Sequence, residues 1–255
     1  MNIKYAMWIS AFFSLTLPSM STAAVTLQGT RIVFDSGKGH DVSIQAENRG
    51  DQAALVQVWI DTGDSNARPE DLRTPFRLTP SEPRLLQAHQ GQAFRITYAP
   101  RPADEPLPSD RESVLYFNLL DIPPKPAGAG TTNLLQFAIR TRIKLFHRPA
   151  GLRGDARDAA GQLVWTLEKG SLRIVNPSAY HVTLSTLSLP DGSPLELALD
   201  MIAPGQSTRI PLPSNSAQPA FVSYQWLDDY GAQREGRGSL RPEVAGFMPS
   251  GEGGG

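Results

Sequence analysis

The sequence of 255 residues contains no cysteine. Without a thiol, the chain can form no disulfide, no thiolate nucleophile and no cysteine-ligated metal site. Histidine is scarce too, because only His40, His89, His147 and His181 occur, in separate segments without the spacing of metal ligands. We therefore expect no metal and no cofactor, and we expect each histidine to be a surface or packing residue.

The chain also lacks an excess of either charge, since 24 Lys+Arg stand against 25 Asp+Glu and the formal net charge is -1. This balance provides no global attraction to nucleic acid or to an anionic membrane. No G-x-S-x-G nucleophile motif, phosphate-binding loop or zinc motif is present. The adjacent carboxylates Asp228 and Asp229 would point apart on an extended strand, which favours turn or ion-pair roles. The sequence therefore predicts no catalytic residue and no enzyme.

An apolar run from about Tyr5 to Leu17 is too short for a confident transmembrane helix. Lys4 precedes this run, and the small residues Ser21, Thr22 and Ala23 follow it, as in a cleavable export signal. We expect residues 1–23 to be a signal peptide, the mature chain to begin near Ala24, and no stable membrane insertion.

The mature sequence consists of short apolar alternations separated by Gly, Pro, Asn and Asp. Turn signals every 8 to 12 residues predict antiparallel β-sandwiches. A segment rich in breakers and charge follows Phe146 and marks a domain boundary. We expect two all-β domains with a linker and a flexible tail, with the bounds 24–147 for the first domain, 148–155 for the linker, 156–247 for the second domain and 248–255 for the tail. Trp59, within a predicted strand, is expected in the first core.

The stretch from Asn133 to Phe146 has the periodicity of a strand. Its odd positions are mostly apolar and its even positions include Gln136, Arg140, Arg142 and Lys144. The pattern alone favours packing of the apolar face on the domain's own core. Presentation of that face to another protein is the alternative, and it depends on the surrounding motifs.

Four ordered blocks carry a resemblance to a known family. They are AVTLQGTRIVF at 24–34, LPSDRESVLYFNLLDIP at 107–123, IRTRIKLFHRP at 139–149 and DDYG at 228–231. The second block is similar to the signature of the periplasmic pilus (fimbrial) assembly chaperones. The resemblance implies two immunoglobulin-like β-sandwich domains at an angle with an interdomain cleft. The absence of cysteine and the short Lys125–Asn133 loop favour the family's short-loop branch.

The resemblance also implies a function and a location. Such a protein is exported to the periplasm, where it binds pilus subunits that lack a strand and completes their fold by donor-strand complementation, a form of β-strand addition. It then delivers them to an outer-membrane usher. The expected partners are therefore subunits and an usher, self-association of the free protein remains open, and the alternative function is a two-domain exported structural or adhesion protein.

Site residues follow from the same resemblance. Arg31 and Lys144 would bind the subunit's terminal carboxylate, because charge-assisted donors suit a planar anion. Three further residues, Glu112, Arg148 and Asp229, would form a charged cluster that orients the domains. The residues that would enter the subunit groove share one face of the strand and are Asn133, Leu135, Phe137 and Ile139. Because Lys144 has the opposite parity, we expect a twist or bulge between about Thr141 and Lys144.

Overall fold

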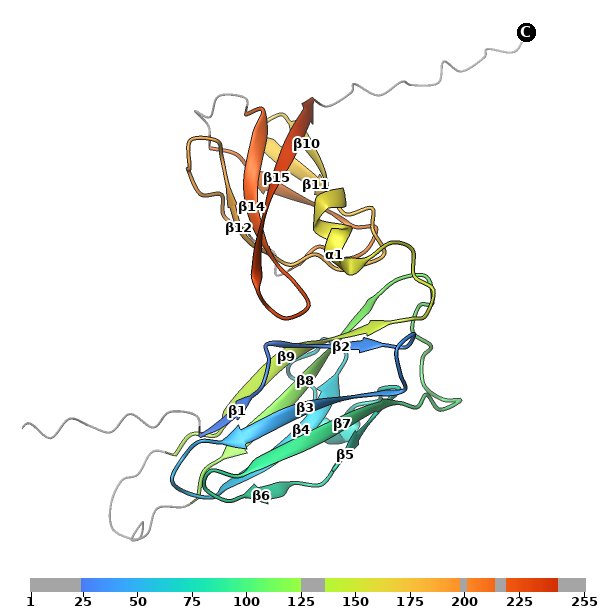
Figure 1. Cartoon of the computed structure of the whole chain (residues 1–255), viewed down its shortest axis with the longest axis vertical. Coiled ribbons are helices and arrows are strands. Elements are labelled where there is room, and N and C mark those ends of the chain that lie inside the picture. The colour runs from blue at the N-terminus through green and yellow to red at the C-terminus, as the bar shows by residue number, and fades with distance from the viewer. Residues whose placement is uncertain (1–23, 125–135, 198–200, 214–218, 243–255) are drawn as a thin grey trace, which may run out of the picture.

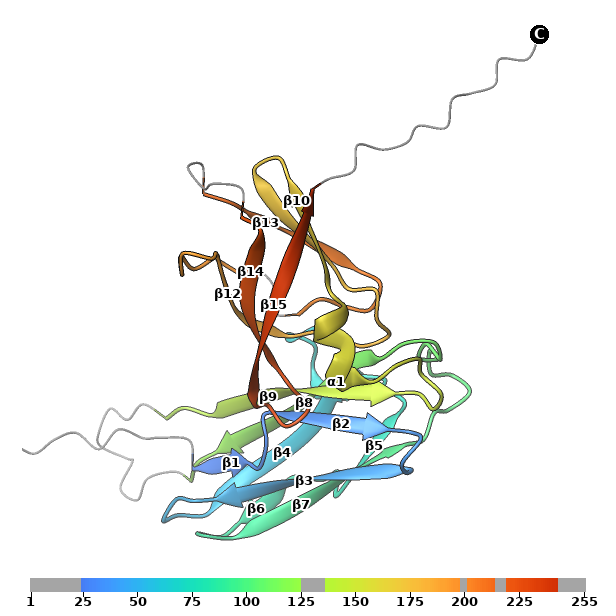
Figure 2. The same cartoon turned by 45° about the horizontal axis from the view of Figure 1, so that its top comes forward.

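A computed structural model describes residues 24–124, 136–197, 201–213 and 219–242 of the chain. Within these ranges the protein forms two β-rich domains, one above the other in Figure 1. The strands of the second domain run across the direction of those in the first, so that the domains meet at an angle (Figures 1 and 2). No helix in these ranges is long and apolar enough to cross a membrane.

The first domain is a sandwich of two sheets. One sheet has the order β1-β3-β7-β5, and the other has the order β2-β9-β8-β4-β6. The strands are β1 (Val25–Leu27), β2 (Arg31–Asp35), β3 (Asp41–Asn48), β4 (Ala54–Asp61), β5 (Phe76–Thr79), β6 (Arg84–Leu86), β7 (Gly91–Tyr98), β8 (Ser113–Ile122) and β9 (Ile139–Arg148), with the short 3-10 helix η1 (Pro69–Asp71) after β4.

The start of the chain contributes to both sheets. β1 pairs with β3 in the first sheet, and β2 pairs in parallel with β9 in the second. Gly29 lies between them with a φ of 121°, a conformation that residues with a side chain rarely adopt. This glycine permits the change of sheet that brings Arg31 beside β9.

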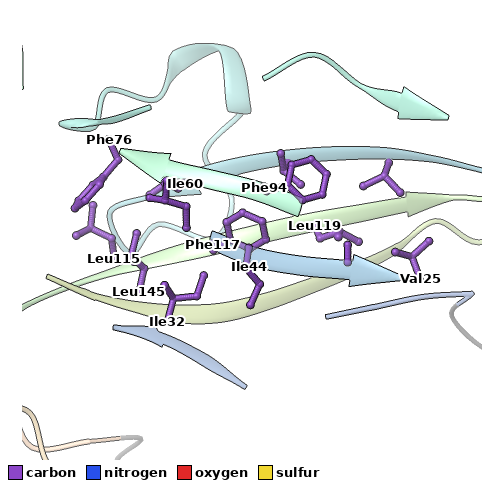
Figure 3. Close-up of a cluster of buried hydrophobic side chains, with 14 of the residues drawn as sticks. Val25, Ile32, Ile44, Ile60, Phe76, Phe94, Leu115, Phe117, Leu119 and Leu145 are labelled. Carbon is purple, nitrogen blue, oxygen red and sulfur yellow. The ribbon is translucent and has the colours of Figure 1, made fainter. Parts of the chain in front are cut away.

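The first core lies between the two sheets. Leu115, Phe117 and Leu119 of β8 point inward together with Leu145 of β9 and Phe94 of β7 (Figure 3). Ten residues of β8 span the middle of the five-stranded sheet between β4 and β9. This central strand fixes the position of β9, which follows it in sequence.

One core expectation was wrong. Trp59 is not part of the buried core, because β4 buries Val58 and Ile60 and turns Trp59 to the outer face of the sheet. There its ring faces the Arg140 guanidinium of β9, 5.9 Å from the ring centroid. Strand parity therefore outweighs the usual preference of tryptophan for burial.

The second domain has its own core within a six-stranded sheet of order β12-β14-β15-β10-β11-β13. β15 joins its two halves, since its first part pairs with β14 and its last residues pair with β10. The elements are α1 (Ala156–Ala159), the 3-10 helix η2 (Ala160–Gln162), β10 (Val164–Glu168), β11 (Ser171–Val175), β12 (Leu184–Ser188), β13 (Ser207–Pro211), β14 (Phe221–Leu227) and β15 (Gln233–Pro242). The turn between β14 and β15 points toward the first domain near β2 and β9 (Figures 1 and 2).

Candidate functional site

The first half of β9 has an open edge. On one side β9 pairs with β8 from Ile139 through His147, whereas on the other side β2 pairs only with the segment from Lys144 to Arg148. Within the described ranges, no strand covers residues 139–143 on that second side. An uncovered row of backbone N–H and C=O groups is a template for pairing with another chain.

The strand is shorter than the predicted stretch. It begins at Ile139 instead of Asn133, and it continues through Arg148. Phe137 lies just before the strand with 63% of its surface exposed, and Ile139 is half-buried. Two of the predicted groove residues therefore lie next to the open edge, and Asn133 and Leu135 lie outside the described residues.

The two faces of β9 have different surroundings. Ile143 and Leu145 face the first core. Phe146 lies 5.8 Å from the His181 ring of the second domain, and Arg148 binds Asp229 there. Odd positions in the second half of β9 therefore face the core, and the even positions Phe146 and Arg148 contact the second domain.

This alternation explains how Lys144 can lie on the face opposite the apolar residues of the same strand. The pairing of β9 with β8 runs from Ile139 to His147 without a register shift, so the expected bulge between Thr141 and Lys144 is absent. None is needed, because Lys144 shares the parity of Phe146 and Arg148 and lies on the face turned to the second domain. A regular strand can present apolar residues on one face and a cation on the other.

Arg31 and Lys144 lie directly opposite each other. They are the first pair in the parallel register of β2 and β9, at the point where the covered half of β9 begins. The Arg31 guanidinium donates a hydrogen bond of 3.3 Å to the carbonyl of Leu227 in the second domain. The central carbon of this guanidinium, Cζ, lies 5.9 Å from the centre of the Phe146 ring. The two predicted anchor residues are thus adjacent and stand at the end of the open edge.

The predicted charged cluster is assembled across the domains. Arg148 donates two hydrogen bonds of 2.6 Å to the Asp229 carboxylate and one of 2.6 Å to Glu112. The side chain of Glu112 is 1% exposed, that of Arg148 is 11% exposed, and that of Asp229 is 36% exposed. Burial alone would lower the pKa of the Arg148 guanidinium, but its hydrogen bonds to the two carboxylates outweigh burial and raise that pKa. The cluster therefore holds a permanent cation between two anions at the domain boundary.

His181 is a member of this cluster that the sequence did not reveal. Its main-chain N–H donates to Glu112 Oε1 over 3.0 Å, and its Nδ1 lies 2.9 Å from the same oxygen. The interaction joins residues 69 positions apart, and a lone histidine in an alternating segment gives no signal for it. Glu112 is consequently bound from both domains.

A hollow between the domains lies beside this cluster, and neither Arg31 nor Lys144 lines it. The hollow has a volume of about 730 Å³ and is lined by residues of both domains, including Asp35, Lys38, Arg148, Asp155 and Tyr230. Its lining is strongly charged. Within the described part of the chain, no group of three or more His, Asp or Glu side chains could hold a metal ion.

Two arginines fasten the open half of β9 to its own domain. Arg142 donates hydrogen bonds of 2.6 and 2.9 Å to the Asp61 carboxylate of β4, and Arg140 donates one of 2.7 Å to the carbonyl of Ser65. Burial would raise the pKa of the Asp61 carboxyl, but hydrogen bonds from Arg142 and Asn118 hold that pKa below 3.8. The Arg142 guanidinium also lies 3.5 Å from the centre of the Tyr116 ring. The strand is thereby held firmly on the side that faces away from the core.

Comparisons with known proteins agree with this architecture. A family model of the pili and flagellar-assembly chaperones, PapD N-terminal domain, matches residues 24–153. A second model, the C-terminal domain of the pili assembly chaperone PapD, matches residues 158–238. Together they span both domains and confirm the resemblance seen in the motifs.

Individual relatives cover most of the chain. The probable fimbrial chaperone YadV of Escherichia coli (strain K12) is 37% identical over 248 residues, which are 94% of this chain and 99% of YadV. The chaperone protein HifB of Haemophilus influenzae is 38% identical over 237 residues, with 91% of this chain and 95% of HifB covered. The crystal structure of the YadV chaperone matches with a TM-score of 0.70 at 34% identity, over 85% of this chain and 100% of that one. The predicted fold of two immunoglobulin-like sandwich domains is confirmed.

Proposed function

The chain belongs to the PapD family of pili assembly chaperones, and we propose that it binds fimbrial subunits by pairing them with the open half of β9. Members of this family are assembly chaperones and not enzymes. The observation that carries the proposal is the arrangement of β9, whose uncovered half ends at the adjacent cations Arg31 and Lys144.

Backbone pairing would supply the sequence-tolerant part of the affinity. A subunit strand placed beside residues 139–143 would satisfy backbone groups that no strand in the described ranges covers. Each new backbone hydrogen bond contributes about 0.5 to 1.5 kcal/mol. One chaperone could thus serve several subunits of different sequence.

The apolar residues beside the open edge of β9 would supply the remaining part of the affinity. Phe137 and Ile139 would enter the subunit's groove, and we extend the same role to Asn133 and Leu135, which lie outside the described residues. Complete burial of one such apolar side chain contributes about 1.5 to 3 kcal/mol. The exposure of Phe137 supports this role, because its burial is still available on binding.

Arg31 and Lys144 would bind the terminal carboxylate of the subunit and set the register of the new pairing. Two cations opposite each other can grip both oxygens of a carboxylate. A shift of the subunit strand by one residue would turn each of its side chains to the other face, and a fixed end point would prevent that shift. Glu112, Arg148 and Asp229 would hold the two domains at the angle that keeps this site open.

Export and delivery complete the proposal. The chain would be exported to the periplasm by residues 1–23, and it would pass its subunits to an outer-membrane usher. Free protein could cover its own open edge by self-association. The absence of cysteine and the short Lys125–Asn133 loop favour the short-loop branch of the family. Membership of a chaperone family speaks against the alternative of an exported structural or adhesion protein.

Co-expression with fimbrial subunits encoded beside it tests the proposal. The wild-type chain should keep a subunit soluble and co-purify with it, and Lys144→Ala should remain folded but lose the complex. Lys169→Ala is the matched control, because Lys169 is exposed in the turn between β10 and β11 of the second domain. Equal subunit solubility with and without the chain would refute the chaperone function, whereas normal complex yield from Lys144→Ala would refute only the anchor.

A further inference from the structure

A buried carboxylate lies beside the start of the first domain. The side chain of Asp121, on β8, accepts hydrogen bonds on Oδ2 from the main-chain N–H groups of Ala24 at 3.0 Å and Val25 at 3.1 Å. Asp121 is only 4% exposed, and its Oδ1 is buried without a hydrogen-bond partner in the described residues. Leaving a buried acceptor of a charged group unsatisfied is costly.

The charge of Asp121 also needs a partner. Buried carboxylates are usually paired with a cation. None of the ion pairs formed among the described ranges includes Asp121, although Asp61 and Glu112, the other two buried carboxylates described in the first domain, each pair with an arginine. The backbone nitrogen of Ala24 lies 3.0 Å from the carboxylate, and it would become a cation in a chain that starts at Ala24.

The position of Ala24 is fixed by its neighbours. Its carbonyl accepts a hydrogen bond of 2.7 Å from the N–H of Arg49, and Val25, the next residue, is buried in the core. Gly50 packs so closely that a Cβ added there would lie 2.8 Å from the Cβ of Ala24. The backbone nitrogen of Ala24 is therefore held against Asp121.

We propose that the export signal is cut between Ala23 and Ala24, and that the new α-ammonium of Ala24 forms a buried ion pair with Asp121. Hydrolysis of this peptide bond consumes one water molecule, leaves a carboxylate on Ala23 and leaves an amine on Ala24 that takes up a proton at neutral pH. An ammonium has three N–H donors where the peptide had one. It can therefore serve Oδ1 as well as Oδ2, which the uncut chain cannot do.

The ion pair would link maturation to the open strand. Asp121 lies directly opposite Ile139, the first residue of β9, in the pairing of β8 with β9. The new amino terminus would thus stabilise the place where the open half of β9 leaves the sheet. Removal of the signal would complete the folded domain as well as release it from the export machinery.

Two measurements test the proposal. Intact-mass analysis of the exported protein should give a chain that starts at Ala24, and a start at any other residue would overturn the proposal. Thermal unfolding then compares protein starting at Ala24 with protein carrying an added Gly-Ser before Ala24. The extension should lower the melting temperature by roughly 3 to 12 °C, as expected for loss of a buried charged hydrogen bond in a chain of this size.

Asp121→Asn provides the coupling test. In this background the Gly-Ser extension should change the melting temperature by less than a third of its wild-type effect, whereas in the control Asp51→Asn, an exposed site, the full effect should remain. Equal effects in all three backgrounds would refute the ion pair. If Asp121→Asn does not fold, the rate of acylation of the Ala24 amine in wild-type protein tests the ion pair instead. At pH 7 this rate should be at least tenfold slower in folded than in urea-unfolded protein. Equal rates would refute the proposal.

Discussion

Replacement of Arg148 by methionine should destabilise the protein and loosen the angle between its domains. Methionine keeps much of the length of the side chain but removes three hydrogen bonds of 2.6 Å to Glu112 and Asp229. Removing one partner of a buried ion pair costs about 3 to 5 kcal/mol, because the remaining charge stays buried. Asp229 is 36% exposed and can rehydrate, so the cost arises mainly at Glu112, which is 1% exposed.

The lower end of that range is therefore expected for Arg148→Met. Glu112 keeps the N–H of His181 as a donor at 3.0 Å, which reduces its loss. A decrease of about 3 kcal/mol in the free energy of unfolding corresponds to a fall of roughly 6 to 12 °C in melting temperature for a chain of this length. Calorimetry measures the stability, and small-angle X-ray scattering measures the spread of interdomain distances, which should widen.

The matched control for this experiment is Arg157→Met. Arg157 forms an exposed ion pair with Asp155 near the same domain boundary, and solvent screening leaves such a pair little effect on stability. Its loss should leave the melting temperature and the scattering curve nearly unchanged. The reasoning would be refuted if Arg148→Met lost less than about 1 kcal/mol and scattered like the wild type.

Three further substitutions test other parts of the molecule. Phe137→Ala should weaken subunit binding about 5- to 25-fold in a titration, which is the burial energy of an apolar side chain scaled by the 63% of Phe137 that is exposed in the free protein. Gln136→Ala, the neighbour of opposite parity, is the control and should bind normally. Burial lowers the pKa of His147 below 6.5, so the unfolded chain binds more protons as the pH falls below that value, and wild-type stability should decline there; His147→Phe should remove this decline in urea titrations at pH 7 and pH 5. Because the pKa of Asp61 is held below 3.8, its contribution is present above that pH and lost as acid protonates it, so Asp61→Asn should lose stability at pH 7 but approach the wild type near pH 2.

The sequence predicted what depends on strand periodicity and local motifs. The strand over Ile139–Arg148 and the adjacency of Arg31 and Lys144, which the family resemblance implied, both agree with the structure. The parity of Trp59 was also readable, but the general preference of tryptophan for burial led to the wrong expectation. The bulge near Lys144 was unnecessary, because Lys144 shares the face of Phe146 and Arg148, which contact the second domain.

Contacts between distant segments could not be predicted in the same way. The link from His181 to Glu112 joins the two domains, and the link from Asp121 to Ala24 spans 97 positions. Neither leaves a periodic or local trace in the chain, because each depends on how complete sheets pack. The start of β9 at Ile139 could not be predicted either, because it is set by where the pairing with β8 ends, at Asp121.

The most direct test of donor-strand complementation is amide hydrogen exchange of the chain with and without a bound subunit. The amides of residues 139–143 that point away from β8 should exchange quickly in the free protein and become strongly protected in the complex. Amides of β6, the opposite edge of the same sheet, should not change. A stable complex in which residues 139–143 gained no protection would contradict the assignment of β9 as the donor strand.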